Sequence, residues 1–272
     1  MLRKFHVSFP GAKYRAMTLL SVTAAACLSS APSMKAADNP SPATVETAKQ
    51  FKFQKTLKAD VDYLLFLPKA AESNSEKRWP LIFFLHGAGE RGAEVWKVAI
   101  HGPPKIVAQK PNFPFIVVSP QCPEGKIWNN DVLLGLLDEV LRAYPVDASR
   151  VYLTGLSMGG YGTWSLGLTY PEKFAALVPI CGGGELLSML LARGEPTKAA
   201  ALRSLGVWAF HGGKDPIVPL AESERMVDLL KNGGVTDVKL TVYPEAGHDS
   251  WTKAYNNPEL YDWLLRHSRS SP

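Results

Sequence analysis

A serine stands between two glycines directly after a short apolar run in the middle of the chain. The segment G-L-S-M-G at residues 155–159 follows V-Y-L-T at residues 151–154. A G-x-S-x-G turn between a strand and a helix raises the serine hydroxyl above a sheet, and its glycines permit the tight backbone. Because Gly and Ser are common, the motif by itself also fits an ordinary loop. It becomes a candidate nucleophile, Ser157, only if the chain also supplies a base and a carboxylate.

Two later residues supply those groups. Asp215 ends the glycine-rich turn H-G-G-K-D at residues 211–215, and His248 lies in the loop G-H-D-S at residues 247–250. A serine hydroxyl needs a neighbouring base, usually a histidine held by a carboxylate, and the order Ser, Asp, His is the one expected after such a turn. We therefore predict that His248 is the base for Ser157 and that Asp215 orients it. The alternatives are a turn aspartate at 215, with Asp249 as a substitute carboxylate, and a solvated loop histidine at 248.

The chemistry also requires backbone N–H groups that stabilise an oxyanion. Met158, directly after the serine, and Ala88, in the loop L-H-G-A-G-E-R-G at residues 85–92, are the predicted donors. Arg91 in the same loop either forms an ion pair with Glu90, the interpretation we favour, or meets a substrate oxygen. His86 and His211 each precede a glycine after an apolar run, and we expect them to orient loops by hydrogen bonding.

Three tryptophans lie near these motifs in the sequence, at positions 128, 164 and 251. Tryptophan is usually a core residue, so packing is the competing interpretation for each of them. Trp128 is the one most expected to face a ligand, and Trp251 is a further candidate because it follows His248 closely. No Cys/His group has zinc-finger spacing, and the glycines form no nucleotide-binding motif, so no metal or cofactor is expected.

The elements that must position these residues are short apolar runs typical of strands buried on both faces. They occupy residues 81–85, 115–119, 151–154, 176–180, 207–210 and 238–243. Helical spacing of apolar residues separates several of them, at 132–141, 221–231 and 258–267. Alternating patterns at 50–58 and 61–67 predict an antiparallel N-terminal hairpin. We expect an α/β fold with a mostly parallel, doubly wound sheet of about eight strands, and each candidate residue follows the carboxyl end of a strand.

The first 37 residues have the pattern of an export signal. Basic residues precede a short apolar stretch at 16–28, which is too short to span a bilayer stably. The predicted organisation is a signal peptide at 1–37, a short tether at 38–49 and one catalytic domain at 50–272. Export to the periplasm or the exterior follows, with a lipid anchor on Cys27 as the alternative.

Five of the 30 basic residues and none of the 25 acidic ones lie in this leader, so the remaining chain is formally neutral and gives no reason to expect a nucleic-acid partner.

Four segments together resemble the α/β-hydrolase superfamily, in the esterase and predicted-peptidase branch related to polyhydroxybutyrate depolymerases and feruloyl esterases. They are residues 85–92, 120–123, 154–164 and 247–251. The resemblance implies a Ser157-His248-Asp215 triad and oxyanion donors at Ala88 and Met158. It also implies an α/β-hydrolase fold without a large cap. Residues 185–205 depart from the pattern and are expected to form one or two short helices, either packed on the domain or placed as a small flap.

The sequence thus predicts an exported serine carboxylesterase that acts on short-chain or aromatic esters of the acetyl or feruloyl type, either as small molecules or linked to polysaccharide. A serine peptidase of the prolyl-oligopeptidase type and a noncatalytic binding protein on the same fold are the alternatives. The remaining cysteines, Cys122 and Cys181, end strands separated by two others, so we expect free buried thiols rather than a disulfide. The oligomeric state is not predicted.

Overall fold

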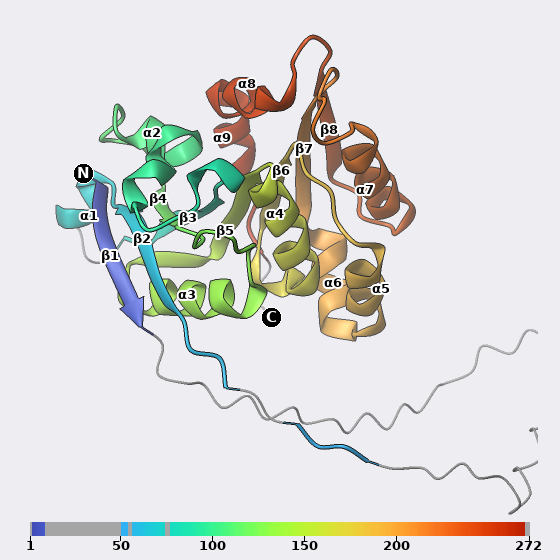
Figure 1. The fold of residues 1–272 in the computed structure, drawn as a ribbon, viewed down its shortest axis with the longest axis horizontal. Coiled ribbons are helices and arrows are strands. Elements are labelled where there is room, and N and C mark those ends of the chain that lie inside the picture. Colours follow the sequence, from blue (N-terminus) through green and yellow to red (C-terminus); the bar gives the residue numbers. More distant parts are fainter. Residues whose placement is uncertain (1, 9–49, 54–55, 74–76, 270–272) are drawn as a thin grey trace, which may run out of the picture. The chain divides into compact units, whose positions relative to one another are not determined.

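The computed structural model describes residues 2–8, 50–53, 56–73 and 77–269 (Figure 1). Of these, residues 2–8, 59–73 and 77–269 belong to one compact unit, and residues 50–53 and 56–58 belong to a second. The apolar stretch of the predicted signal and the predicted tether lie outside the described residues. Within the described part of the chain, no helix combines the length and apolarity needed to cross a bilayer.

The first unit is built on one eight-stranded sheet with the order β1-β2-β4-β3-β5-β6-β7-β8. Its strands are β1 (Leu2–Ser8), β2 (Asp60–Phe66), β3 (Trp79–Leu85), β4 (Ile116–Pro120), β5 (Val146–Leu156), β6 (Ala176–Ile180), β7 (Gly206–Gly212) and β8 (Val238–Tyr243). The pairs β1/β2 and β2/β4 are antiparallel, and every other pair is parallel. The predicted fold class is confirmed, and the six apolar runs correspond to β3 to β8.

The predicted N-terminal hairpin is wrong in one arm. Among residues 50–53 and 56–58, only an isolated bridge at Leu57 occurs, and β2 pairs instead with β1. The ring of Phe5 stacks on Tyr63, its cross-strand partner, with 5.5 Å between centroids, and His6 Nδ1 lies 2.8 Å from Asp62 Oδ1. These cross-strand contacts favour the observed pairing over the predicted one. This pairing could not be predicted from the sequence because residues 2–8 also fit the pattern of a leader.

Nine helices accompany the strands in the described residues. They are α1 (Lys69–Ser73), α2 (Gly102–Val107), α3 (Asn130–Ala143), α4 (Met158–Thr169), α5 (Leu186–Gly194), α6 (Pro196–Ser204), α7 (Ala221–Asn232), α8 (Trp251–Asn256) and α9 (Pro258–Leu265). The helix α3 illustrates why they form where they do. The side chain of Asn129 caps α3 by accepting hydrogen bonds from the backbone N–H groups of Asp131 and Val132. The apolar side chains of α3 lie on one face of the helix and are buried against the sheet.

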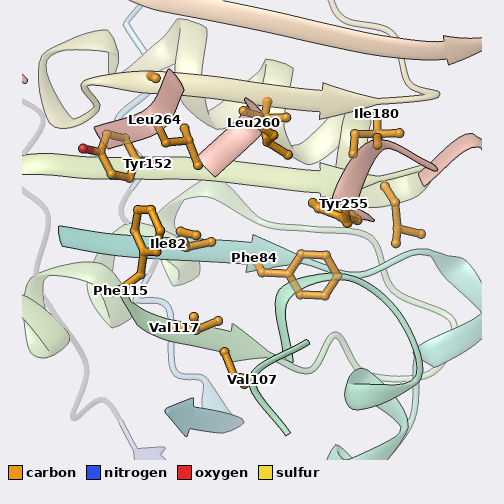
Figure 2. Close-up of a cluster of buried hydrophobic side chains, with 14 of the residues drawn as sticks. Ile82, Phe84, Val107, Phe115, Val117, Tyr152, Ile180, Tyr255, Leu260 and Leu264 are labelled. Atoms are coloured by element: carbon orange, nitrogen blue, oxygen red, sulfur yellow. The ribbon is translucent and has the colours of Figure 1, made fainter. Parts of the chain in front are cut away.

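The apolar core on one face of the sheet joins the strands to α2, α8 and α9. Figure 2 shows Ile82 and Phe84 of β3 facing this cluster, together with Tyr255 of α8. Alternate residues of the same strand, such as Phe83, are equally buried, so the central strands are covered on both faces. This explains why their sequences are continuous apolar runs rather than alternating ones.

The parallel register aligns the carboxyl ends of β3, β5, β7 and β8 along one edge of the sheet. The segments that follow these four strands carry Ala88, Ser157, Asp215 and His248, in that order. Ligands of open α/β sheets bind at this edge. The fold therefore directs the four candidate segments toward one region.

Candidate active site

Ser157 occupies a strained turn between β5 and α4. Its backbone has φ 53° and ψ −117°, a conformation that L-residues other than glycine seldom adopt. The turn is held in place because the Ser157 N–H donates to the carbonyl of Ile180 on the neighbouring strand, over 2.9 Å. The flanking glycines are required by close backbone approach. A Cβ at Gly155 would lie 2.3 Å from the Gly159 carbonyl oxygen, and one at Gly159 would lie 1.9 Å from that of Leu85.

The structure brings the serine, histidine and aspartate together in a hydrogen-bonded row. His248 Nε2 lies 2.9 Å from Ser157 Oγ, and His248 Nδ1 lies 2.7 Å from Asp215 Oδ2. A carboxylate only accepts hydrogen bonds, so Nδ1 carries the proton and donates it to Asp215. In the neutral ring Nε2 is then free to accept from the Ser157 hydroxyl. This arrangement can activate the serine oxygen as a nucleophile.

The carboxylate of Asp215 is held ionised by its partners. Its side chain is buried, and its Oδ1 accepts hydrogen bonds from the backbone N–H groups of Ile217 and Val218, each over 2.9 Å. Burial by itself raises the pKa of this group. The hydrogen bonds from His248, Val218 and Ile217 outweigh it, so the pKa of Asp215 lies below its ordinary value. His211 Nε2 donates to the Val218 carbonyl over 2.9 Å and so fixes the same turn. Asp249, the substitute carboxylate, is exposed.

The two proposed oxyanion donors each begin a helical segment. Met158 is the first residue of α4, and Ala88 is the first of the 3₁₀ turn Ala88–Glu90 that follows β3. The first N–H groups of a helix or turn have no partner within it, and those of the 12-residue α4 also lie at its positive dipole end. The turn at Ala88 is closed by the N–H of Gly87, which donates to Glu90 Oε2 over 2.9 Å. Both N–H groups are therefore of the kind that stabilises an anion.

His86 fixes the loop that carries Ala88. The N–H of Cys122 donates to His86 Nε2 over 2.9 Å, so the ring proton is on Nδ1, which donates to the Gly87 carbonyl over 2.6 Å. The ring is fully buried, and burial lowers the pKa of His86 to about 4. His86 is consequently a neutral imidazole with both nitrogens used. It has the loop-orienting contacts that the sequence suggested.

The ion pair favoured between Glu90 and Arg91 is wrong. The Glu90 carboxylate is buried and turns back to the Gly87 N–H. Arg91 instead donates from Nε to the Ala88 carbonyl and from Nη1 to that of Lys126, over 2.9 and 3.2 Å. The Glu90 carboxylate accepts its hydrogen bond from within the short turn, and Arg91 is therefore left to bridge this loop and the loop that contains Lys126. Arg91 thus lies beside the proposed oxyanion loop and is bonded to backbone.

A cavity of about 560 Å³ opens beside the serine. Its lining residues come from the loop before α3, the start of α4 and the segment before and within α5, and they are Ile127, Trp128, Met158, Tyr161, Gly162, Ser165, Gly183, Gly184, Glu185 and Ser188. Trp128 is in this wall, as its sequence position suggested. Arg91 and Trp251 are not. Trp251 packs edge-on against the ring of His248, with 5.2 Å between centroids, and so supports the histidine from outside the cavity.

Sequence reasoning missed several cavity residues. Tyr161 lies one helical turn after Ser157 on α4, a spacing that could have placed it beside the nucleophile. Glu185 and Ser188 were within the segment expected to be either packed helices or a flap. That segment forms α5 and α6, which contact each other, and α5 also contacts α4, so it packs on the domain while its beginning lines the cavity. No sequence pattern distinguished these residues from others on the same helix.

A second cavity, of about 620 Å³, lies elsewhere, among residues of α2, α8, α9 and the segment before β4. Residues of the Ser157-His248-Asp215 row do not line it. The two strand-end cysteines, Cys122 and Cys181, are free and buried, as expected from the strand order.

Comparison with known proteins gives concordant matches. The family model described as phospholipase/carboxylesterase matches residues 124–257. The acyl-protein thioesterase 1 of Gibberella zeae is 31% identical over 112 residues, which cover 41% of this chain and 46% of that protein. The poly(3-hydroxyoctanoate) depolymerase of Pseudomonas fluorescens is 26% identical over 180 residues, covering 60% of this chain and 63% of that protein.

Among solved structures, a thermostable esterase superposes with a TM-score of 0.63 at 32% identity, covering 78% of this chain and 60% of that one. The chain therefore spans less than two thirds of the length of each of these three proteins. The matched segments include the turn at Ser157, which lies within residues 124–257, as do Asp215 and His248.

Proposed function

Because the chain belongs to the α/β-hydrolase superfamily, in its esterase branch, we propose that it is a serine hydrolase that cleaves carboxylic esters through an acyl-enzyme. The observation that carries this proposal is the hydrogen-bonded row from Ser157 Oγ through His248 to Asp215, with separations of 2.9 and 2.7 Å. The named activities of the matched proteins, thioesterase, depolymerase and esterase, support acyl transfer as the reaction class.

The first half of the proposed reaction forms the acyl-enzyme. Ser157 Oγ attacks the ester carbonyl carbon while its proton passes to His248 Nε2, and the ionised Asp215 stabilises the resulting imidazolium. The carbonyl oxygen becomes an oxyanion, which the N–H groups of Met158 and Ala88 stabilise. The C–O bond to the alcohol then breaks, and His248 returns its proton to the departing alkoxide. The acyl group remains on Ser157.

The second half repeats the sequence with water. His248 removes a proton from a water molecule, the hydroxide attacks the acyl carbon, and a second oxyanion forms at the same two N–H groups. Breakdown of this intermediate returns the proton from His248 to Ser157 Oγ and releases the carboxylic acid. Each proton that leaves is returned, so the residues named here are sufficient for turnover.

The cavity beside Ser157 supports a short or aromatic acyl group. Its volume, about 560 Å³, is in the ordinary range for small-molecule sites, roughly 300–1,000 Å³. Trp128 and Tyr161 supply aromatic surface to the lining, and Glu185 and Ser188 supply polar groups. A lining that combines aromatic and polar groups suits a phenolic acyl group of the feruloyl type or an acetylated sugar. We also propose that the chain is exported, because of the leader pattern at residues 1–37.

A second candidate substrate is a water-insoluble polyester, favoured by the outer surface of α5. Four leucines of this helix are exposed, Leu186, Leu187, Leu190 and Leu191, with Leu191 at 67%. The same helix contributes Ser188 to the cavity lining. An exposed apolar surface on a helix that also lines the cavity is suited to lie on a polymer while one ester group enters. Replacing Leu187 and Leu191 by Ser should then reduce hydrolysis of a polyester suspension and spare a soluble ester.

The experiment that tests the proposal compares ester and amide substrates directly. A p-nitrophenyl ester series from acetyl to decanoyl, methyl ferulate and a peptide p-nitroanilide would be assayed with the parent protein and with Ser157→Ala. We expect turnover of short-chain esters or ferulate that Ser157→Ala abolishes. Turnover of the anilide alone would favour the peptidase alternative. A folded parent protein without activity on any substrate would overturn the esterase proposal and favour a binding protein.

A further inference from the structure

A thiol lies close to the histidine and the aspartate of the hydrogen-bonded row. Cys181 directly follows β6, and its backbone φ of 41° bends the chain at that point. Its Sγ, a carboxylate oxygen of Asp215 and a ring nitrogen of His248 all lie within 4.8 Å of one another. The three atoms come from the ends of three different strands. Thiolate, imidazole and carboxylate are the ligand types that Zn²⁺ takes in proteins.

A fourth polar group faces this cluster. The hydroxyl of Ser250 is fully buried and has no hydrogen-bond partner among the described residues. Burial raises the pKa of the Cys181 thiol to about 12, and the nearby backbone of Ser157 and side chain of Ser250 act in the opposite direction. A buried hydroxyl without a hydrogen-bond partner destabilises the folded protein unless something binds to it. The cluster thus combines a soft donor with an unsatisfied polar atom.

We propose that Cys181, Asp215 and His248 form a binding site for a thiophilic divalent cation such as Zn²⁺, and that an ion bound there blocks the active site. The cation takes the place of the proton between His248 Nδ1 and Asp215 Oδ2. Binding releases one proton to solvent, from the thiol of Cys181, which must be deprotonated to bind the cation. The imidazole stays neutral, so its proton moves from Nδ1 to Nε2, which then no longer accepts from Ser157 Oγ. Ser250 Oγ or a water completes four-fold coordination.

The geometry explains why such an ion would inhibit. On a tetrahedral zinc with bonds of about 2.1 Å, two ligand atoms lie roughly 3.4 Å apart. Nδ1 and Oδ2 are now 2.7 Å apart, so binding must separate them. The imidazole then shifts relative to Ser157 Oγ, from which Nε2 is 2.9 Å away, and the positive ion lowers the basicity of the ring. Only this inhibitory consequence rests on the proposed hydrolase function, since the binding site is defined by its ligands.

Direct binding can be measured without any activity. Cd²⁺ is the probe, because a cadmium–thiolate bond gives a charge-transfer absorption in the ultraviolet. The protein carries Cys27→Ser throughout, so that Cys122 and Cys181 are the remaining thiols. We expect a band that saturates at one Cd²⁺ per chain and persists in Cys122→Ser and in Ser157→Ala. Cys181→Ser is expected to abolish the band. If circular dichroism shows that this variant folds poorly, Cys181→Ala takes its place. A band that follows Cys122, or no band, would overturn the proposal.

Inhibition is tested in parallel with Zn²⁺ on p-nitrophenyl acetate hydrolysis, with reversal by a chelator. We expect the concentration for half-inhibition to rise at least about tenfold in Cys181→Ser and to stay unchanged in Cys122→Ser, tenfold being a loss of roughly 1.4 kcal/mol in binding. Equal sensitivity in parent and Cys181→Ser would contradict the proposal. If no ester is hydrolysed at all, the proposed function fails while the cadmium titration still decides the site.

Discussion

The indole N–H of Trp128 donates a hydrogen bond to the carbonyl of His86, with 3.2 Å between Nε1 and O. The two rings also meet edge-on, with 4.8 Å between centroids. Trp128 is a wall of the cavity, whereas His86 fixes the backbone that carries Ala88. This contact therefore joins the surface that would receive the acyl group to the loop that would stabilise the oxyanion.

Substitutions at Trp128 should separate these two roles. Trp128→Phe keeps an aromatic wall but removes the donor, and loss of one hydrogen bond of about 1 kcal/mol predicts a roughly fivefold lower kcat with little change in KM. Trp128→Ala removes the wall as well and should raise KM for methyl ferulate more than for p-nitrophenyl acetate. Steady-state kinetics on both esters measures the difference. Trp96→Phe, at an exposed tryptophan outside the cavity lining, is the matched control and should match the parent.

Asp215→Asn should reduce kcat strongly without unfolding the protein. The amide carries no charge to stabilise the imidazolium, and its NH₂ group can donate to Nδ1 and so hold the tautomer with the proton on Nε2. A loss of roughly 10³–10⁴-fold is expected. Burst kinetics with p-nitrophenyl acetate would measure acylation directly. Asp249→Asn changes a neighbouring exposed carboxylate and should retain near-parent activity. A larger loss at Asp249 than at Asp215 would reverse the assignment.

The sheet could be predicted because its strands are buried on both faces. A short continuous apolar run such as residues 176–180 is typical of a strand buried on both faces, and β6 has those bounds in the structure. The placement of Ser157, Asp215 and His248 beyond strand ends follows from the same parallel order. Motif chemistry and strand periodicity agreed at these positions, which made the hydrogen-bonded row predictable before any geometry was known.

The cavity wall and the edge of the sheet could not be predicted in the same way. Ser188 is placed by the packing of α5 on α4, which depends on side-chain fit rather than on any local pattern. The edge strand β1 could not be predicted because a leader and a strand can have the same sequence. Cross-strand contacts such as those of Phe5 with Tyr63 and His6 with Asp62 distinguish them. Glu90 was assigned to its neighbour in sequence, although a 3₁₀ turn brings it back to Gly87.

Acid should destabilise the folded state through His86. Its pKa is about 4 in the folded protein, against an ordinary value of 6.5, so between these values the unfolded chain binds a proton that the folded chain does not. The free energy of unfolding must then fall as the pH is lowered through this window. From about pH 7 to about pH 5, His86 accounts for a decrease of roughly 2 kcal/mol in the free energy of unfolding. Urea unfolding at both pH values measures it. In His86→Gln, which cannot titrate, the pH-dependent loss should shrink by about that amount, and an unchanged loss would contradict the assignment.

Gly159→Ala should disrupt the turn at Ser157, because the added Cβ would meet the Leu85 carbonyl oxygen at 1.9 Å. Backbone cannot move aside as a side chain end can, so β3 and α4 would have to separate. We expect loss of activity together with a decrease in the free energy of unfolding of several kcal/mol, or failure to fold. Gly89→Ala is the matched control. Its Cβ meets nothing within 4 Å, so its stability in thermal unfolding should remain close to that of the parent.

Removal of residues 1–37 should leave hydrolysis intact while weakening the sheet edge. The strand β1 lies at one end of the sheet order, and the segments that carry Ser157, Asp215 and His248 follow β5, β7 and β8. The truncated chain loses the pairing of β1 with β2 and the stacking of Phe5 on Tyr63, an aromatic pair worth about 1 kcal/mol. We expect kcat/KM for p-nitrophenyl acetate to stay within about twofold of the full chain, since changes far from a site seldom alter it. We also expect a lower urea midpoint for unfolding.

In the full chain, Phe5→Ala should reproduce part of the stability loss with unchanged kinetics. Loss of activity on truncation, with the fold retained, would mean that β1 contributes to the site and would argue against its removal as a signal.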